Sequence, residues 1–250
     1  MSETFENCSM AGVIFHNVNL EGAVFDDVNL AGGRIHNANL GNFTIEDAYI
    51  KGLTIFGFRV DQLIEAELDR RDPERPRLRM ADCFDPECVR AVLDHLGEVR
   101  AEFRAFLREA DPALLSARPD AENWSAIENL RHLIFAEDLY LNHWLLQNNE
   151  PWCKHGLRPA FLADNPDYAE VGSQPCEDIE QLLAAWESIH VRMMAFVATV
   201  SADELHRDTS KLDFGQGTVG RVLQTLSLHD LEHIRQAEAA VTKLSQPAGR

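Results

Sequence analysis

Three histidines of this chain have residue types and spacings that suit a metal ion. His229 and His233 are four residues apart, so both imidazoles leave the same face if this segment is a helix. His132 belongs to a separate segment that is also predicted to be helical. Three nitrogen ligands with one open position are the usual arrangement of a catalytic metal. The three histidines therefore predict a site for a divalent metal ion.

The histidine pair interrupts an apolar stripe that predicts a helix over residues 218–244. Its positions alternate at spacings of three and four: Val219, Val222, Leu226, His229, His233, Gln236 and Ala240. Two histidines thus stand where leucine or isoleucine is expected. A buried imidazole without a partner costs roughly 1–3 kcal/mol, and a metal ion on the helix face would remove that cost.

The neighbouring acidic residues argue against a zinc peptidase. The H-E-x-x-H motif needs a glutamate directly after the first histidine, and Asp230 in this place is one methylene shorter. Asp230 and Glu232 are expected to point away from the core into solvent. Glu137 could accept a hydrogen bond from an imidazole, but a solvated or helix-pairing role is the favoured interpretation.

Three further long helices must position these residues. The first begins at the N-cap Asp85, and the third spans residues 177–200. The second carries His132, begins with a capping box at Ser125, and is expected to reach residue 147. Together with the segment that holds the histidine pair, they predict an antiparallel four-helix bundle.

The first sixty residues follow a different rule, a period of five. Large apolar residues occupy every fifth position: Phe5, Met10, Phe15, Leu20, Phe25, Leu30, Ile35, Leu40, Ile45, Ile50 and Ile55. A smaller or apolar residue usually stands two positions earlier. Residues 3–58 therefore resemble the pentapeptide-repeat family, although Gly33 and Phe43 depart from its pattern. The resemblance implies a short right-handed quadrilateral β-helix that works as a packing or dimerisation module.

Composition limits the partners and the compartment of the chain. Its formal net charge of −18 opposes binding to nucleic acid or to an anionic membrane, because phosphate contacts need a basic face. No apolar run is long enough for a membrane span, and no signal peptide is evident. The five cysteines lack metal-binding spacing, so we expect reduced thiols and a cytoplasmic location.

The helical half resembles the DinB-like superfamily, most of all a bacterial subgroup with a short repeat-like segment in front. The resemblance covers about residues 84–244 and depends on Trp124-Ser125, on His132, and on His229 and His233. It implies zinc or nickel held by these three histidines. It also implies a low-molecular-weight thiol as a co-substrate, which the metal activates by deprotonation. A homodimer is compatible with it, since family members often act as dimers.

The predicted organisation is an α+β multidomain chain. Residues 1–59 form the β-helix, residues 60–83 a capping helix and linker, and residues 84–245 the bundle. The predicted function is a metal-dependent transferase or hydrolase that acts on a small molecule, with its pocket shaped by the loop at residues 148–176. No catalytic acid, base or organic cofactor is assigned. The alternative is a non-enzymatic protein-interaction module in which the metal is structural or absent.

Overall fold

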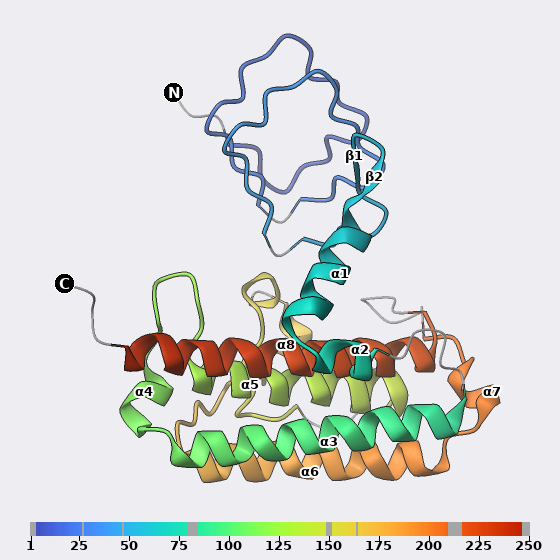
Figure 1. The fold of residues 1–250 in the computed structure, drawn as a ribbon, viewed down its shortest axis with the longest axis vertical. Helices are drawn as coiled ribbons and strands as arrows, with labels where there is room; N and C mark the ends of the chain where they lie inside the picture. Colours follow the sequence, from blue (N-terminus) through green and yellow to red (C-terminus); the bar gives the residue numbers. More distant parts are fainter. Residues whose placement is uncertain are drawn as a thin grey trace. The chain divides into compact units, whose positions relative to one another are not determined.

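The computed structural model divides into two compact units, over residues 1–46 and 47–250. We call them the N-terminal unit and the helical unit (Figure 1). The residues that the structure describes are 4–26, 28–46, 48–79, 85–148, 152–163, 165–209 and 217–246.

The backbone of the N-terminal unit turns with the period of its sequence. Every ten residues, a backbone N–H donates to the carbonyl three residues earlier. Examples are Val13 N to Met10 O (3.0 Å) and Ala23 N to Leu20 O (3.0 Å). The same position of successive turns has a left-handed φ of +77° at Gly12 and +76° at Gly22. A type II turn requires this φ, and glycine adopts it without strain. Asn7 and Asn17, five residues before each glycine, also have a positive φ of +52° and +55°, so the left-handed position recurs with the five-residue period of the sequence.

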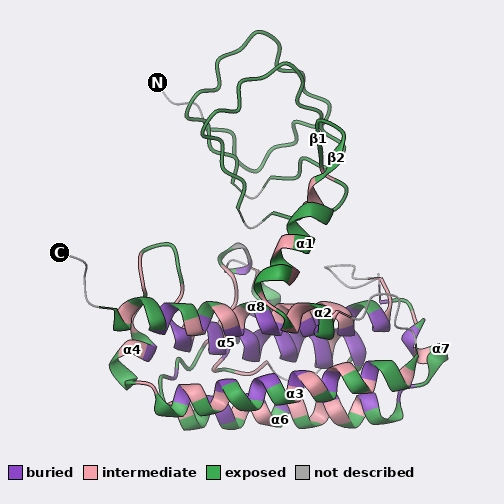
Figure 2. Ribbon diagram, viewed as in Figure 1, coloured by how far each residue is buried: buried purple, intermediate pink, exposed green. Residues whose placement is uncertain are grey.

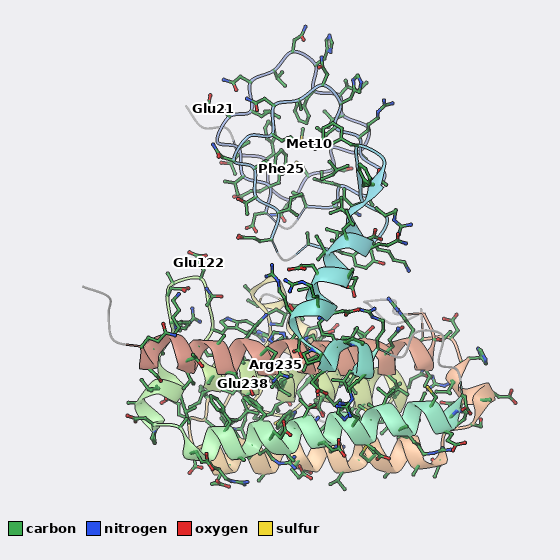
Figure 3. All side chains as sticks on the ribbon, viewed as in Figure 1. Met10, Glu21, Phe25, Glu122, Arg235 and Glu238 are labelled. Atoms are coloured by element: carbon green, nitrogen blue, oxygen red, sulfur yellow. The ribbon has the colours of Figure 1, made fainter. Side chains whose placement is uncertain are left out.

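The apolar side chains of these repeats are only partly covered. Figure 3 shows Met10 and Phe25 inside the outline of the coil and Glu21 outside it. Even so, Met10 is 38% exposed and Phe25 is 45% exposed. Among residues 4–26 and 28–46 no regular strand is formed. The inward direction agrees with a solenoid, whereas the β-helix itself stays a prediction.

The helical unit begins with a two-stranded hairpin and continues almost entirely as helix. Strands β1 (Thr54–Ile55) and β2 (Phe58–Arg59) pair antiparallel. The helices are α1 (Val60–Arg71), α2 (Glu74–Leu78), α3 (Pro86–Glu109), α4 (Pro112–Ser116), α5 (Ala126–Asp138), η1 (Leu139–Leu145), η2 (Ala160–Leu162), η3 (Pro166–Tyr168), α6 (Ile179–Thr199), α7 (Ala202–Leu205) and α8 (Val219–Ser245). The predicted caps are confirmed: the Asp85 side chain accepts from Glu87 N, and Ser125 and Glu128 form the capping box.

The four long helices pack pairwise around one apolar core. Helices α3 and α5 each contact both α6 and α8, and Figure 2 shows their facing sides buried. The core consists mainly of leucine, valine and isoleucine, with Phe103 and Trp186 as its large aromatic members. This packing fixes which faces of α5 and α8 meet, and those two helices carry the three histidines.

One buried ionic cluster joins all four helices. The guanidinium of Arg100 on α3 donates to Glu137 on α5 and, at 3.1 Å, to Asp230 on α8. The indole of Trp186 on α6 also donates to Glu137, and Arg100 lies 3.8 Å above its ring centroid. All four side chains are fully buried. Burial, together with the nearby Glu137 carboxylate, raises the pKa of Asp230 well above its ordinary value.

The expectation that Asp230 faces solvent is wrong, whereas Glu137 pairs with another helix, which is one of the two roles expected for it. The buried face of α8 extends one residue beyond the expected stripe and includes Leu223, Asp230 and Ile234, whereas Gln236 is exposed. A carboxylate is buried only with a partner, and Arg100 is 130 residues from Asp230 in the chain. Sequence periodicity does not reveal such a distant partner.

The second long helix also differs from the prediction in its last two turns. Helix α5 ends at Asp138, and residues Leu139–Leu145 continue as the π-helix η1. The wider hydrogen bonding is seen from Leu146 N to Leu141 O at 2.8 Å. π-helical turns are rare and occur frequently at functional sites. Here the turn directly follows the segment that carries His132.

The cysteines are not all reduced. Cys8, Cys153 and Cys176 are free, but Cys88 is in a disulfide, so the prediction of reduced thiols is wrong for that residue. Cys83 lies outside the described residues. A disulfide depends on the approach of two Cα atoms to about 4.4–6.8 Å, which cysteine spacing alone does not reveal. In the described part of the chain no helix has the length and apolarity to cross a membrane.

Arg100→Met tests the ionic cluster. Removing the guanidinium leaves two carboxylates buried without their cation, so we expect the free energy of unfolding to fall by about 3–5 kcal/mol. Arg104→Met, one turn further along α3, breaks only the partly exposed pair with Glu187 and should cost below about 1 kcal/mol. Urea unfolding followed by circular dichroism measures both. Equal losses for the two variants would contradict a structural role specific to Arg100.

Candidate metal centre

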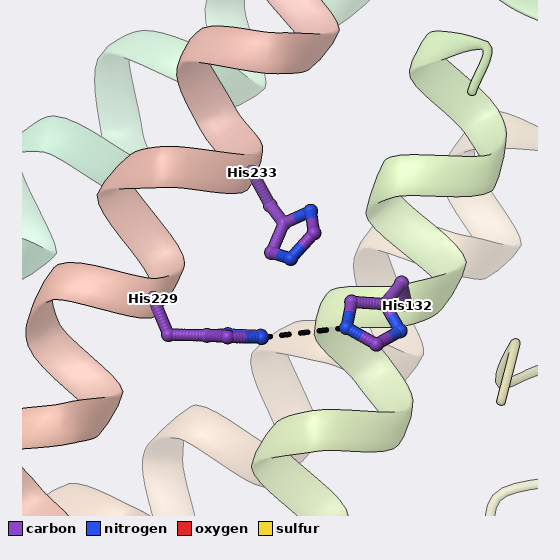
Figure 4. Close-up of side chains that lie close together, drawn as sticks. All are labelled: His132, His229 and His233. Atoms are coloured by element: carbon purple, nitrogen blue, oxygen red, sulfur yellow. Dashed lines mark hydrogen bonds between the residues drawn. The ribbon is translucent and has the colours of Figure 1, made fainter. Parts of the chain in front are cut away.

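The fold brings the three predicted histidines together. His132 comes from α5, and His229 and His233 come from successive turns of α8 (Figure 4). One nitrogen of each ring lies within 4.8 Å of the others. The Nε2 atoms of His132 and His229 are 3.3 Å apart, and each of these rings lies 4.5 Å from the His233 ring, centroid to centroid.

Hydrogen bonds on the far side of two rings fix their tautomers. Nδ1 of His132 lies 3.1 Å from the carbonyl oxygen of Leu157, which only accepts, so Nδ1 carries the proton. Nδ1 of His233 lies 2.9 Å from Oδ1 of Asn129. The amide of Asn129 is oriented by its own bond to the Ser125 carbonyl. The Nε2 atoms of His132 and His233 are therefore left with lone pairs.

His229 is the least satisfied of the three rings. Its Nδ1 is buried and has no hydrogen-bond partner. Its Nε2 faces the lone pair of His132. An Nε2 proton on His229 would satisfy that one contact and leave Nδ1 of His229 without a donor. A cation among the rings would accept lone pairs from all three, so the donor set fits a metal ion.

The surroundings keep these imidazoles neutral. Burial is the main cause that lowers the pKa of His132 below its ordinary value. Burial also lowers the pKa of His229 strongly, with smaller contributions from His233 and His132. For His233, burial and then His132 lower the pKa to about 3. Metal ions bind the neutral imidazole, so near pH 7 all three rings are in the binding form.

Aromatic side chains border the histidines. The Trp124 ring centroid lies 4.9 Å from that of His132 and 6.0 Å from that of His233. Tyr140, in the π-helix, stands perpendicular to His229 at 5.9 Å, and Phe135 lies 6.0 Å from His132. Such rings exclude water and raise the strength of electrostatic interactions at the centre.

Sequence reasoning missed the groups that orient the ligands. Asn129 is a buried polar residue one turn before His132, and its position inside an apolar run was the available signal. The Leu157 carbonyl is a backbone group and gives no signal in the sequence. Glu137 lies in the ionic cluster instead of against an imidazole. His155 bonds to Gln174 O in the loop and is not part of the centre.

Comparison with protein families places the helical unit. The model of the DinB superfamily matches residues 95–237, which is more than half of the chain. The chain belongs to the DinB superfamily. The match begins in α3 and ends in α8, so this DinB domain includes all three histidines. Eight pentapeptide repeats match residues 5–42. No curated protein and no solved structure matches the chain.

The neutral imidazoles of the DinB domain predict a loss of stability in acid. In the native state His229 stays neutral, whereas in the unfolded chain it takes up a proton below about pH 6.5. Lowering the pH therefore favours unfolding, by up to about 1.4 kcal/mol per pH unit for each such histidine. In the presence of a chelator, we expect the wild type to lose more unfolding free energy between pH 7 and 5 than His229→Leu. Parallel losses in urea titrations would contradict a buried neutral His229.

Proposed function

We propose that the protein is a metal-dependent enzyme of the transferase or hydrolase type, with a divalent metal on His132, His229 and His233. One observation carries the proposal: two fixed tautomers direct lone pairs at the same space as a third, unsatisfied ring. Membership of the DinB superfamily is consistent with it. Zinc or nickel suits three imidazole nitrogens.

The residues of the centre have separate roles in this proposal. The three imidazoles hold the ion, and the Leu157 carbonyl and the Asn129 amide orient two of them. When bound, the metal would lower the pKa of a coordinating low-molecular-weight thiol or water and make it a nucleophile near neutral pH. Trp124 and Tyr140 would form the apolar wall against which a small-molecule substrate packs. We assign no side chain as a general acid or base.

The architecture that we propose follows from the two family matches. The long helices would form the antiparallel four-helix bundle, and the pentapeptide segment would form a right-handed quadrilateral β-helix. We place the protein in the cytoplasm as a possible homodimer, without nucleic-acid or membrane partners. The exposed apolar residues of the repeats, such as Phe15 at 51%, favour a protein contact there.

That exposure also supports a second candidate function, a non-enzymatic interaction module. Here the N-terminal unit binds a protein, and the histidines hold a structural ion or none. The two candidates differ in what the metal does. An enzyme needs an open coordination position that a thiol or water can reach, whereas a structural ion would be inert toward both.

Metal content is the direct test of the centre. After removal of metal and reconstitution with Zn²⁺ or Ni²⁺, we expect about one ion per wild-type chain by mass spectrometry. His229→Ala should lose most of it, because two ligands remain. His206→Ala, which removes an exposed histidine at the C-terminal end of α7, is the matched control and should bind as much metal as the wild type.

The same samples separate the two candidate functions. Metal-loaded wild type should accelerate the reaction of a low-molecular-weight thiol with an aryl chloride, or the hydrolysis of an ester, and His229→Ala should not. Binding without either reaction would support the interaction module with a structural ion. A wild type that takes up neither metal after reconstitution would eliminate the proposed enzyme.

A further inference from the structure

His132 receives its orienting contact from outside the long helices. The carbonyl of Leu157, 25 residues further along the chain, accepts from Nδ1. Leu157 lies in the connection between η1 and α6. The contact therefore exists only while this connection is docked on α5. We call residues 153–157 the strap.

Arg131, the neighbour of His132 in the sequence, holds the strap through three hydrogen bonds. Its Nε donates to the His155 carbonyl at 2.9 Å, and its Nη2 donates to the Gly156 carbonyl at 3.4 Å. Its own backbone carbonyl accepts from Leu157 N at 2.9 Å. The guanidinium thus donates only to backbone carbonyls of the strap in these contacts. Arg131 as a whole contacts three successive strap residues.

The strap packs tightly at Gly156, where an added Cβ would need its neighbours to shift by a few tenths of an ångström. A Cβ on Gly156 would lie 3.1 Å from Cβ of Phe135 and 3.2 Å from Cγ1 of Val171. At the other end of the strap, Cys153 N donates to the buried Asp138 carboxylate of α5 at 2.8 Å. Steric fit and the hydrogen bonds of Arg131 therefore determine the same docked position.

We propose that Arg131 is a positioning residue for the metal centre, acting through the strap and the Leu157 carbonyl on His132. The inference depends on the proposed metal site. A group that fixes the tautomer and orientation of a ligand imidazole typically contributes 10- to 100-fold in metal affinity. Linkage is reciprocal, so a metal that needs oriented His132 must also stabilise the docked strap.

Arg131→Met removes the guanidinium donors and keeps a side chain of similar length. We expect the Zn²⁺ affinity, measured by competition with a chromophoric chelator, to fall roughly 10- to 100-fold. Arg235→Met is the matched control. This arginine is two residues from His233 and pairs with Asp72 and Glu238, not with the strap, so the affinity should stay unchanged. Arg131→Lys, which keeps one donor group, should restore part of the affinity.

Hydrogen exchange supplies a readout that a merely structural role would not change. In the wild type, Zn²⁺ should slow exchange of the Leu157 amide, which donates to Arg131 O. In Arg131→Met the metal should protect it much less. Gly156→Ala adds a methyl group that crowds the strap against Phe135 and Val171 without altering Arg131, and by the same inference it weakens Zn²⁺ binding. This second variant decides the question if Arg131→Met fails to fold.

The outcomes separate this inference from the proposed function. A wild type that does not bind Zn²⁺ overturns both. A wild type that binds, with Arg131→Met and Gly156→Ala binding equally tightly, overturns only the role of Arg131. Weaker binding by Arg131→Met with no effect of Zn²⁺ on strap exchange in the wild type also overturns it, because linkage would then be absent.

Discussion

The placement of the histidines depends on the buried guanidinium of Arg100. One charged group from α3 meets carboxylates from α5 and α8, and Trp186 of α6 closes the cluster. Because Asp230 must point at Arg100, the rotation of α8 is fixed. His229, the residue directly before Asp230, then faces about 100° away, toward α5. The direction of the ligands thus follows from an ion pair that does not touch them.

The same helices therefore carry two polar layers inside one apolar core, the ionic cluster and the histidines. The polar groups of the two layers find their partners in different ways. A buried ion pair offsets its desolvation only with good geometry, and it fixes one arrangement better than leucine would. The histidine layer has no opposite charge and consists of neutral rings with lowered pKa values. Its unsatisfied nitrogen at His229 is a cost that the fold alone does not remove.

Local signals in the sequence predicted the helix starts and the three histidines, because caps and a spacing of four depend on neighbouring residues only. Non-local signals were lost. The partners of Asp230 and Glu137 come from other helices, so Asp230 was assigned to solvent and Glu137 was left between a solvated and a helix-pairing role. The widened turn at Leu139–Leu145 has no composition of its own. The Leu157 carbonyl, like every backbone carbonyl, cannot be recognised from the residue type.

The charge of the donor set determines what chemistry the centre favours. In the proposed centre, three neutral imidazoles would leave the full charge of a divalent ion to act on whatever occupies an open position. A carboxylate ligand would neutralise part of that charge and acidify a bound thiol or water less. Asp230 is adjacent to His229 in sequence and could have supplied such a ligand. Its direction toward Arg100 keeps its carboxyl group paired elsewhere, so the ionic cluster both orients α8 and would leave the charge of a bound ion unneutralised.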